Sequence, residues 1–262
     1  MELRFQAGGP ESWSADAVIV FLSEDEKLEK AYPELLDAAP WMSIAPGMRD
    51  FHGKKGEMGL LYGPPAHPLS RAVVVGLGKL DALTYAETLE EIRKGAGAAA
   101  VRCRELGVDT LALPVSGLAR FNADVERTIE EIVCAAMLGL WRNKAFKSKE
   151  PEDADPRWLA LLFCDANVPD FPRLAARRGE THAEAVILAR NLANTPTPED
   201  MAEEARKLAR RHDMNCEVLE REDIVSLGMG AFAAVAAGSA NDPRLIILEH
   251  APAGHADEAP LI

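Results

Sequence analysis

The sequence lacks a long hydrophobic run, a leader-like start and any Cys-x-x-Cys pair. No apolar run approaches the about 18 residues of a membrane-spanning helix, so we expect no membrane partner. The segment Met1 to Ser12 has no basic stretch followed by an apolar one, so it does not resemble a secretory signal. The four cysteines are scattered: Cys103, Cys134, Cys164 and Cys216. Scattered thiols favour a reduced, cytoplasmic protein.

Positive charge is also in short supply. Lys and Arg number 29 against 42 Asp and Glu, which gives a formal net charge of -13. Such a charge repels a phosphate backbone unless a basic stripe overrides it. The basic clusters at Arg177-Arg178 and from Arg206 to Arg211 have acidic neighbours on expected helices, and we interpret them as solvated faces. A nucleic-acid partner is therefore not expected. The 262 residues suffice for one large or two ordinary domains.

The common signatures of enzyme chemistry are missing as well. The sequence contains neither His-Glu-x-x-His nor Gly-x-Ser-x-Gly. Gly76-Leu77-Gly78 follows an expected strand but lacks the third glycine of a dinucleotide fingerprint, so a tight turn explains it better. The segment from Gly238 to Asn241 and Gly228-Met229-Gly230 are interpreted as a turn and a helix end. The histidines His52, His67, His182 and His212 lie far apart in the sequence.

One segment collects possible metal ligands close to the end of the chain. His250 and His255 are followed by Asp257 and Glu258. Pro252 and several small residues between them provide no helix to preset ligand geometry, and no thiolate is near. A solvated turn, rather than a metal site, is therefore the favoured interpretation of this segment.

Short apolar runs alternate with amphipathic helical patterns, which predicts an α/β layer architecture. Strands are expected at 17–22, 71–76, 109–114 and 158–164. Between them, Thr84 and Glu87 form a capping box, and Gly107 is placed to end the helix that follows. A second helix is expected from Val125 to Leu140.

The last third begins with Phe171-Pro172, after which a helical pattern runs to about Asn191. The helix is expected to stop at 193–196, because the residue before a proline is pushed out of the α region. A new helix is predicted with Thr197 as N-cap and Pro198 at its first position. Strands at 217–219 and 244–249 enclose a short helix ending at Leu227-Gly228 and an alanine-rich segment. The acidic loop 148–156 is not taken as a boundary, because the strand after it continues the alternation of the first domain. We predict domains at 1–170 and 197–262, joined by a helix over 171–196.

Several blocks of the last third resemble the leucyl (cytosol) aminopeptidase family. In order, they are Ala-Arg-Asn-Leu-Ala-Asn-Thr-Pro at 189–196, Val-Leu at 218–219, Leu-Gly-Met-Gly at 227–230, Gly-Ser-Ala-Asn at 238–241 and Pro-Arg-Leu-Ile at 243–246. The segments 73–79, 138–141 and 146–147 resemble the amino-terminal domain of that family more weakly. One departure is that Thr197-Pro198 follows the first block directly, where the family usually has a few more residues.

The resemblance implies a macro-domain-like, three-layer amino-terminal domain, then an interdomain helix and the incomplete opening of an α/β catalytic domain. It implies a metallo-exopeptidase that releases amino-terminal residues from peptides, works with two divalent metals (Zn or Mn) and assembles as a homo-hexamer. No residue of this chain aligns with the family's metal ligands, whose segments would lie beyond Ile262. The resemblance therefore implies no catalytic, metal-binding or cofactor-binding residue in this chain, and we expect the chain alone to be inactive. Two alternatives remain open: a non-catalytic assembly module, and a macro-domain-like binder of a nucleotide such as ADP-ribose.

Overall fold

The computed structural model describes residues 1–121, 124–143, 154–164, 170–194, 197–251 and 254. These residues form two compact units, Met1–Ile187 and Leu188–Ile262. The division falls inside the segment 171–196 that was expected to be an interdomain helix, and the predicted boundaries at 170 and 196 stay a prediction.

The first unit is built around one six-stranded sheet in the order β1-β6-β5-β2-β4-β3. Neighbouring strands are parallel except β3 and β4, which are antiparallel. The strands are β1 (Glu2–Gln6), β2 (Ala17–Leu22), β3 (Met58–Tyr62), β4 (Arg71–Gly76), β5 (Thr110–Pro114) and β6 (Trp158–Leu162). Every residue of β2 is buried, as expected of a parallel strand covered on both faces.

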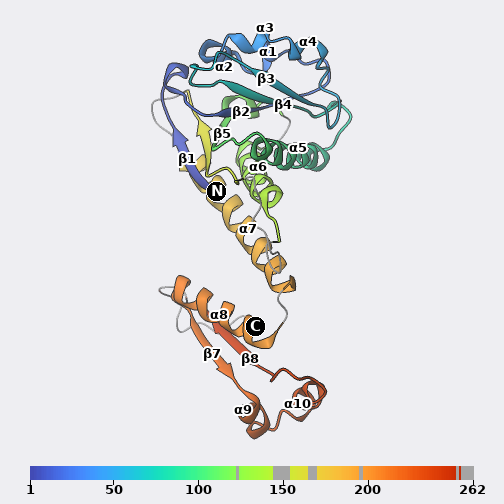
Figure 1. Cartoon of the computed structure of the whole chain (residues 1–262), viewed down its shortest axis with the longest axis vertical. Helices are drawn as coiled ribbons and strands as arrows, with labels where there is room; N and C mark the ends of the chain where they lie inside the picture. Colours follow the sequence, from blue (N-terminus) through green and yellow to red (C-terminus); the bar gives the residue numbers. More distant parts are fainter. Residues whose placement is uncertain (122–123, 144–153, 165–169, 195–196, 252–253, 255–262) are drawn as a thin grey trace. The chain divides into compact units, whose positions relative to one another are not determined.

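Helices cover both faces of this sheet and make a three-layer unit (Figure 1). On one face lie α5 (Tyr85–Glu105), α6 (Val125–Leu140) and the first part of α7 (Asp170–Asn194). On the other lie α1 (Leu28–Ala31), α2 (Pro33–Ala38), α3 (Trp41–Ile44) and α4 (Gly47–Asp50). Two short 3-10 helices, Pro10–Ser12 and Ser116–Leu118, complete the unit's described elements.

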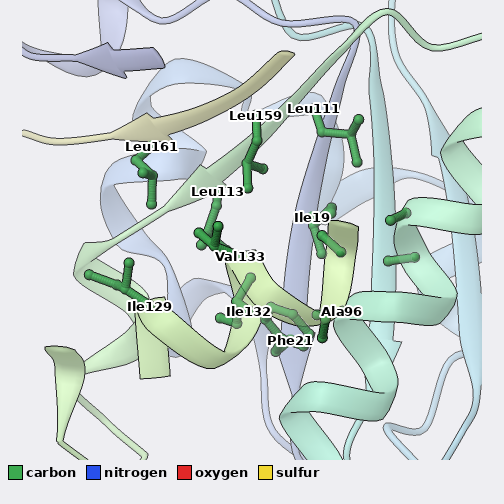
Figure 2. Packing of buried hydrophobic residues seen from close by; sticks show 14 of the residues in the cluster. Ile19, Phe21, Ala96, Leu111, Leu113, Ile129, Ile132, Val133, Leu159 and Leu161 are labelled. Carbon is green, nitrogen blue, oxygen red and sulfur yellow. The ribbon is translucent and has the colours of Figure 1, made fainter. Parts of the chain in front are cut away.

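The alternation of side chains along β2 divides the core into two clusters. Ile19 and Phe21 join the cluster under α5 and α6, whereas Val18 and Val20 join the cluster under α1 to α4. Figure 2 shows Ile19 and Phe21 packed with aliphatic side chains of β5, β6 and α6. A mixed α/β sandwich with a mainly parallel sheet is therefore confirmed.

Local sequence signals account for several element ends. Thr84 and Glu87 form the predicted capping box at the start of α5. Gly107 follows the end of that helix with a φ of 65°, a left-handed conformation that favours glycine. The predicted bounds of β2, β4 and α6 match the structure residue for residue.

Other elements differ from the prediction. Strand β6 ends at Leu162 rather than Cys164. Helix α7 ends at Asn194, within the stop predicted at 193–196. Helix α7 also includes Pro172, which is tolerated because the first turn of a helix needs no N–H donor there. The strands β1 and β3 and the four helices α1 to α4 were not anticipated. The four helices have only four to six residues each, too few to show a helical repeat.

The second unit contains the end of α7, α8 (Pro198–His212), β7 (Asn215–Leu219), α9 (Arg221–Ser226), α10 (Gly230–Ala236) and β8 (Leu245–Glu249). Thr197 caps α8 by accepting a hydrogen bond from the Asp200 N–H, as predicted. Strands β7 and β8 form an antiparallel pair. Most of the predicted acidic loop, 148–156, lies outside the described residues. None of the helices in the described parts of the chain is long and apolar enough to cross a membrane.

Candidate functional site

The carboxyl edge of the first unit's sheet is where ligands bind in open α/β folds. Gly76 is the last residue of β4 there, and Leu77 and Gly78 follow it. Their three N–H groups donate to the carbonyl oxygens of Glu57 at 2.8 Å, of Leu22 at 2.9 Å and of Gly53 at 2.8 Å. A phosphate cradle needs such N–H groups pointing at the ligand. Here they hold the backbone together instead, in agreement with the tight-turn interpretation.

Glycine at position 76 has a packing reason. A Cβ built on Gly76 would lie 2.2 Å from the carbonyl oxygen of Lys54, closer than any real contact. The loop that carries Lys54 therefore passes directly over the end of β4. Both the spacing and the residue type of Gly76-Leu77-Gly78 follow from this close approach, without a ligand.

The neighbouring end of β2 is occupied by Arg120. Its Nε donates to Glu26 Oε1 at 2.8 Å, and its two Nη atoms donate to the carbonyl oxygens of Gly117 and Phe21. The guanidinium also stacks over the Tyr32 ring, with its carbon 4.5 Å from the ring centre. All three nitrogens of Arg120 are thus used within the chain. No local sequence pattern predicts this role, because the partners Arg120 and Phe21 are 99 positions apart.

The histidines are not brought together. His52 lies between α4 and β3, and His67 bonds the backbone of Leu69 through its Nδ1. His182 lies in α7, and His212 is the last residue of α8. Among the described residues, no group of three or more His, Cys, Asp or Glu side chains is arranged to hold a metal ion. His255, Asp257 and Glu258 lie outside the described residues.

A cluster of charged side chains around two buried carboxylates joins α6 to α7. Glu130 and Glu131 of α6 are 4% and 6% exposed. Glu130 accepts from Arg127 at 2.5 Å, from Arg178 at 3.0 Å and from His182 at 3.1 Å. Hydrogen bonds to Glu130, and then to Glu126, raise the pKa of Arg178. Each buried carboxylate is thus matched by cations of its own chain, so the cluster is a clamp between helices rather than a reactive site.

The two candidate turns of the second unit behave as turns. Ser239 Oγ accepts a hydrogen bond from the Asn241 N–H at 3.1 Å, which is a local serine turn. Gly228 follows the end of α9 with a φ of 72°, the left-handed conformation of a helix C′ residue. Neither segment is arranged as a nucleophile or a phosphate cradle.

An apolar groove of about 450 Å³ lies in the second unit. It is lined by residues of α8, α10 and β8 and of the loops beside them, namely Pro198, Met201, Phe232, Val235, Ala236, Ser239, Asn241, Pro243, Arg244 and Ile246. The charged residue of this lining is Arg244, whose Nε donates a hydrogen bond to Glu199 at 2.9 Å. The groove therefore offers apolar surface with its cation already neutralised. Sequence analysis had not identified it.

The first unit is a complete three-layer α/β sandwich, and the second is a two-stranded sheet with helices. The model of the cytosol aminopeptidase family's N-terminal domain matches residues 17–150, and the model of its catalytic domain matches residues 187–262. The chain belongs to the cytosol aminopeptidase family.

Curated relatives and solved structures agree with this assignment. The chain is 46% identical to a probable cytosol aminopeptidase of Nitratidesulfovibrio vulgaris, covering 100% of this chain and 53% of the relative. It is 45% identical to the probable cytosol aminopeptidase of Desulfovibrio desulfuricans, covering 100% of this chain and 52% of that relative. The chain thus spans about half the length of these relatives.

Two solved structures share the fold. A tomato leucine aminopeptidase mutant superposes with a TM-score of 0.69 at 22% identity, over 95% of this chain and 50% of that one. The bottromycin maturation enzyme BotP in complex with Mn superposes with a TM-score of 0.66 at 24% identity. The match covers 90% of this chain and 45% of that one. The recognition from sequence is confirmed, as is the fold class.

Proposed function

We propose that this chain supplies the amino-terminal part of a leucyl aminopeptidase-type metallo-exopeptidase, which releases amino-terminal residues from peptides. The observation that carries the proposal is the order of the two family matches. The N-terminal-domain match comes first, and the catalytic-domain match follows it from 187 to 262. The relatives aligned over the whole chain are about twice its length. We further propose the domain division 1–170, 171–196 and 197–262.

The resemblance implies two divalent metals, Zn or Mn, held by a lysine, aspartates and a glutamate. The described residues bring together no set of carboxylates and imidazoles that fits such a pair. Glu130 and Glu131, the buried carboxylates, are already paired with arginines. We therefore assign no catalytic or metal-binding residue to this chain and derive no catalytic step from it. When bound in the whole enzyme, the metals would supply an activated water as nucleophile.

The proposal predicts that the isolated chain does not hydrolyse a leucine anilide, even with Mn²⁺ or Zn²⁺ added. A metal-bound nucleophile needs its cation in a fixed, open coordination site. The same chain fused to the second half of the N. vulgaris relative is expected to be active. Chelator-sensitive turnover that co-purifies with the isolated chain would refute the first expectation, and an inactive but folded fusion would refute the second.

A nucleotide-binding function is less well supported. The N–H groups of Gly76, Leu77 and Gly78 are engaged by backbone carbonyls, and Arg120 fills the end of β2. A non-catalytic assembly role would use the apolar groove of the second unit. We propose a cytoplasmic location and, from the family resemblance, a homo-hexamer; sedimentation of the fusion would test the assembly.

A further inference from the structure

The two edge strands of the first unit's sheet, β1 and β3, differ in charge. On β1, Glu2 and Arg4 are both exposed, and the Arg4 guanidinium lies over the Trp158 ring, 3.3 Å from its centre. Charged side chains on an edge strand oppose pairing with another chain. β3 contains neither a charged residue nor a proline. Its outer edge pairs with no other strand among the residues the structure describes, so this edge is left unprotected.

The surroundings of β3 are also free of charge. Residues 58–70 contain no Asp, Glu, Lys or Arg, and neither do residues 38–48. The two stretches meet just after the strand, where a Cβ built on Gly63 would lie 2.4 Å from the ring of Trp41. They form a neutral region in a chain whose formal net charge is -13. Two copies of so acidic a chain repel each other, and a neutral surface is where they can approach at the lowest electrostatic cost.

The pairing of β3 with β4 determines which backbone groups of β3 face outward. Just beyond the strand, the Gly63 N–H donates to the Ser70 carbonyl oxygen at 2.8 Å. In an antiparallel ladder, residues that bond the neighbouring strand alternate with residues that do not. Counting back from Gly63, the N–H and C=O groups of Met58, Leu60 and Tyr62 therefore point to the outer edge.

The same three residues place apolar side chains on one face of the sheet, because successive side chains of a strand alternate between faces. Met58 and Leu60 are partly buried against the core under α5 and α6, and Tyr62 is 61% exposed. A large apolar side chain thus stands on either side of Leu60. Turning the strand end for end keeps this pattern, so the edge is complementary to itself.

We propose that the outer edge of β3 pairs with the same edge of a second copy of this chain, antiparallel about a two-fold axis at Leu60. Leu60 then faces Leu60 of the other copy, and Met58 faces Tyr62, which permits a sulfur–aromatic contact without opposing like charges. The outward N–H and C=O groups bond one another, and the two six-stranded sheets become continuous. Because the same patch is used by both copies, the contact closes as a dimer.

A second copy accounts for the edge better than an unrelated strand does. An unrelated strand would need only the unpaired backbone, whereas the symmetric apolar pattern about Leu60 and the neutral surroundings both favour self-pairing. The inference goes beyond the proposed function, since peptide hydrolysis does not specify which surface meets another copy.

Sedimentation velocity of the full chain over a range of concentrations tests the proposal. Tyr62→Pro removes an outward N–H without removing a bond to β4. By symmetry the dimer loses two hydrogen bonds, so its dissociation constant should rise at least about tenfold. Tyr62→Asp places a negative charge in each copy at the contact and should act in the same direction. Tyr85→Asp is the matched control, at a 44% exposed position of α5, and should leave the dissociation constant unchanged.

Two results would overturn the proposal. The first is a wild-type chain that stays monomeric up to its solubility limit. The second is a dimer that keeps its affinity in both Tyr62 variants while circular dichroism shows them folded. A dimer that Val235→Asp dissociates instead would place the contact at the groove of the second unit. Activity of the fusion does not enter this comparison, so the proposed function and this proposal can fail separately.

Hydrogen exchange of the wild-type chain decides the question if the Tyr62 variants do not fold. The amides of Met58, Leu60 and Tyr62 should become protected as the protein concentration rises, because pairing covers them only in the dimer. The amides of β1 should exchange at a rate that does not depend on concentration. Concentration-independent exchange along β3 would show that its edge stays unpaired, and the proposal would be wrong.

Discussion

The helix clamp centred on Glu130 provides a quantitative test of the first unit. Glu130→Ala removes a carboxylate whose side chain is 5% exposed and which holds α7 against α6. Its three partners, Arg127, Arg178 and His182, are 44%, 47% and 58% exposed. They can regain water when the carboxylate is lost, so the full penalty of an orphaned buried charge does not arise.

The expected loss of stability follows from the contrast between buried Glu130 and its more exposed partners. Breaking a fully buried ion pair costs about 3–5 kcal/mol, and a hydrogen bond to a charged group contributes about 1.5–3 kcal/mol. With exposed partners we expect a loss of about 2–3 kcal/mol. A domain of this size loses about 2–4 °C of unfolding midpoint per kcal/mol, so the midpoint should fall by about 4–12 °C. Glu130→Gln keeps an acceptor oxygen and should lose less.

The assay is thermal unfolding followed by circular dichroism, together with hydrogen exchange across α7. Glu126→Ala is the matched control, because Glu126 is also on α6 and also binds Arg178, but is 43% exposed. An exposed pair contributes about 0–1 kcal/mol, so this variant should shift the midpoint little. If the two alanine variants unfolded at the same temperature, burial of Glu130 would not be what makes the clamp stabilising.

Two further predictions concern packing. Gly179→Ala should lower the free energy of unfolding by about 1–3 kcal/mol, because the added Cβ would lie 2.3 Å from the Glu130 carbonyl oxygen. A denaturant titration measures this loss, and an unchanged midpoint would refute the prediction. Burial raises the pKa of Cys103 to about 12. Its contribution to stability is therefore complete below the ordinary thiol pKa of about 8.5 and is lost as pH rises towards 12. Iodoacetamide at pH 8 should label Cys103 only after unfolding, and labelling of the native protein would contradict this.

The sequence by itself determined the local elements and the family. The bounds of β2, β4 and α6, the Thr84 capping box and the Thr197 cap were all predicted correctly. Each depends on residues within a few positions of one another, where periodicity and capping chemistry act. Elements without such a signal were missed, above all the short helices between Leu28 and Asp50.

The tertiary structure alone decided which strands are neighbours and which distant side chains are in contact. The strand order β1-β6-β5-β2-β4-β3, the placement of Arg120 over the end of β2 and the clamp from Glu130 to Arg178 join residues far apart in the chain. The groove beside Val235 likewise depends on how α8, α10 and β8 pack, which the sequence patterns do not specify. Burial and long-range pairing depend on how the whole chain packs, which local patterns do not encode.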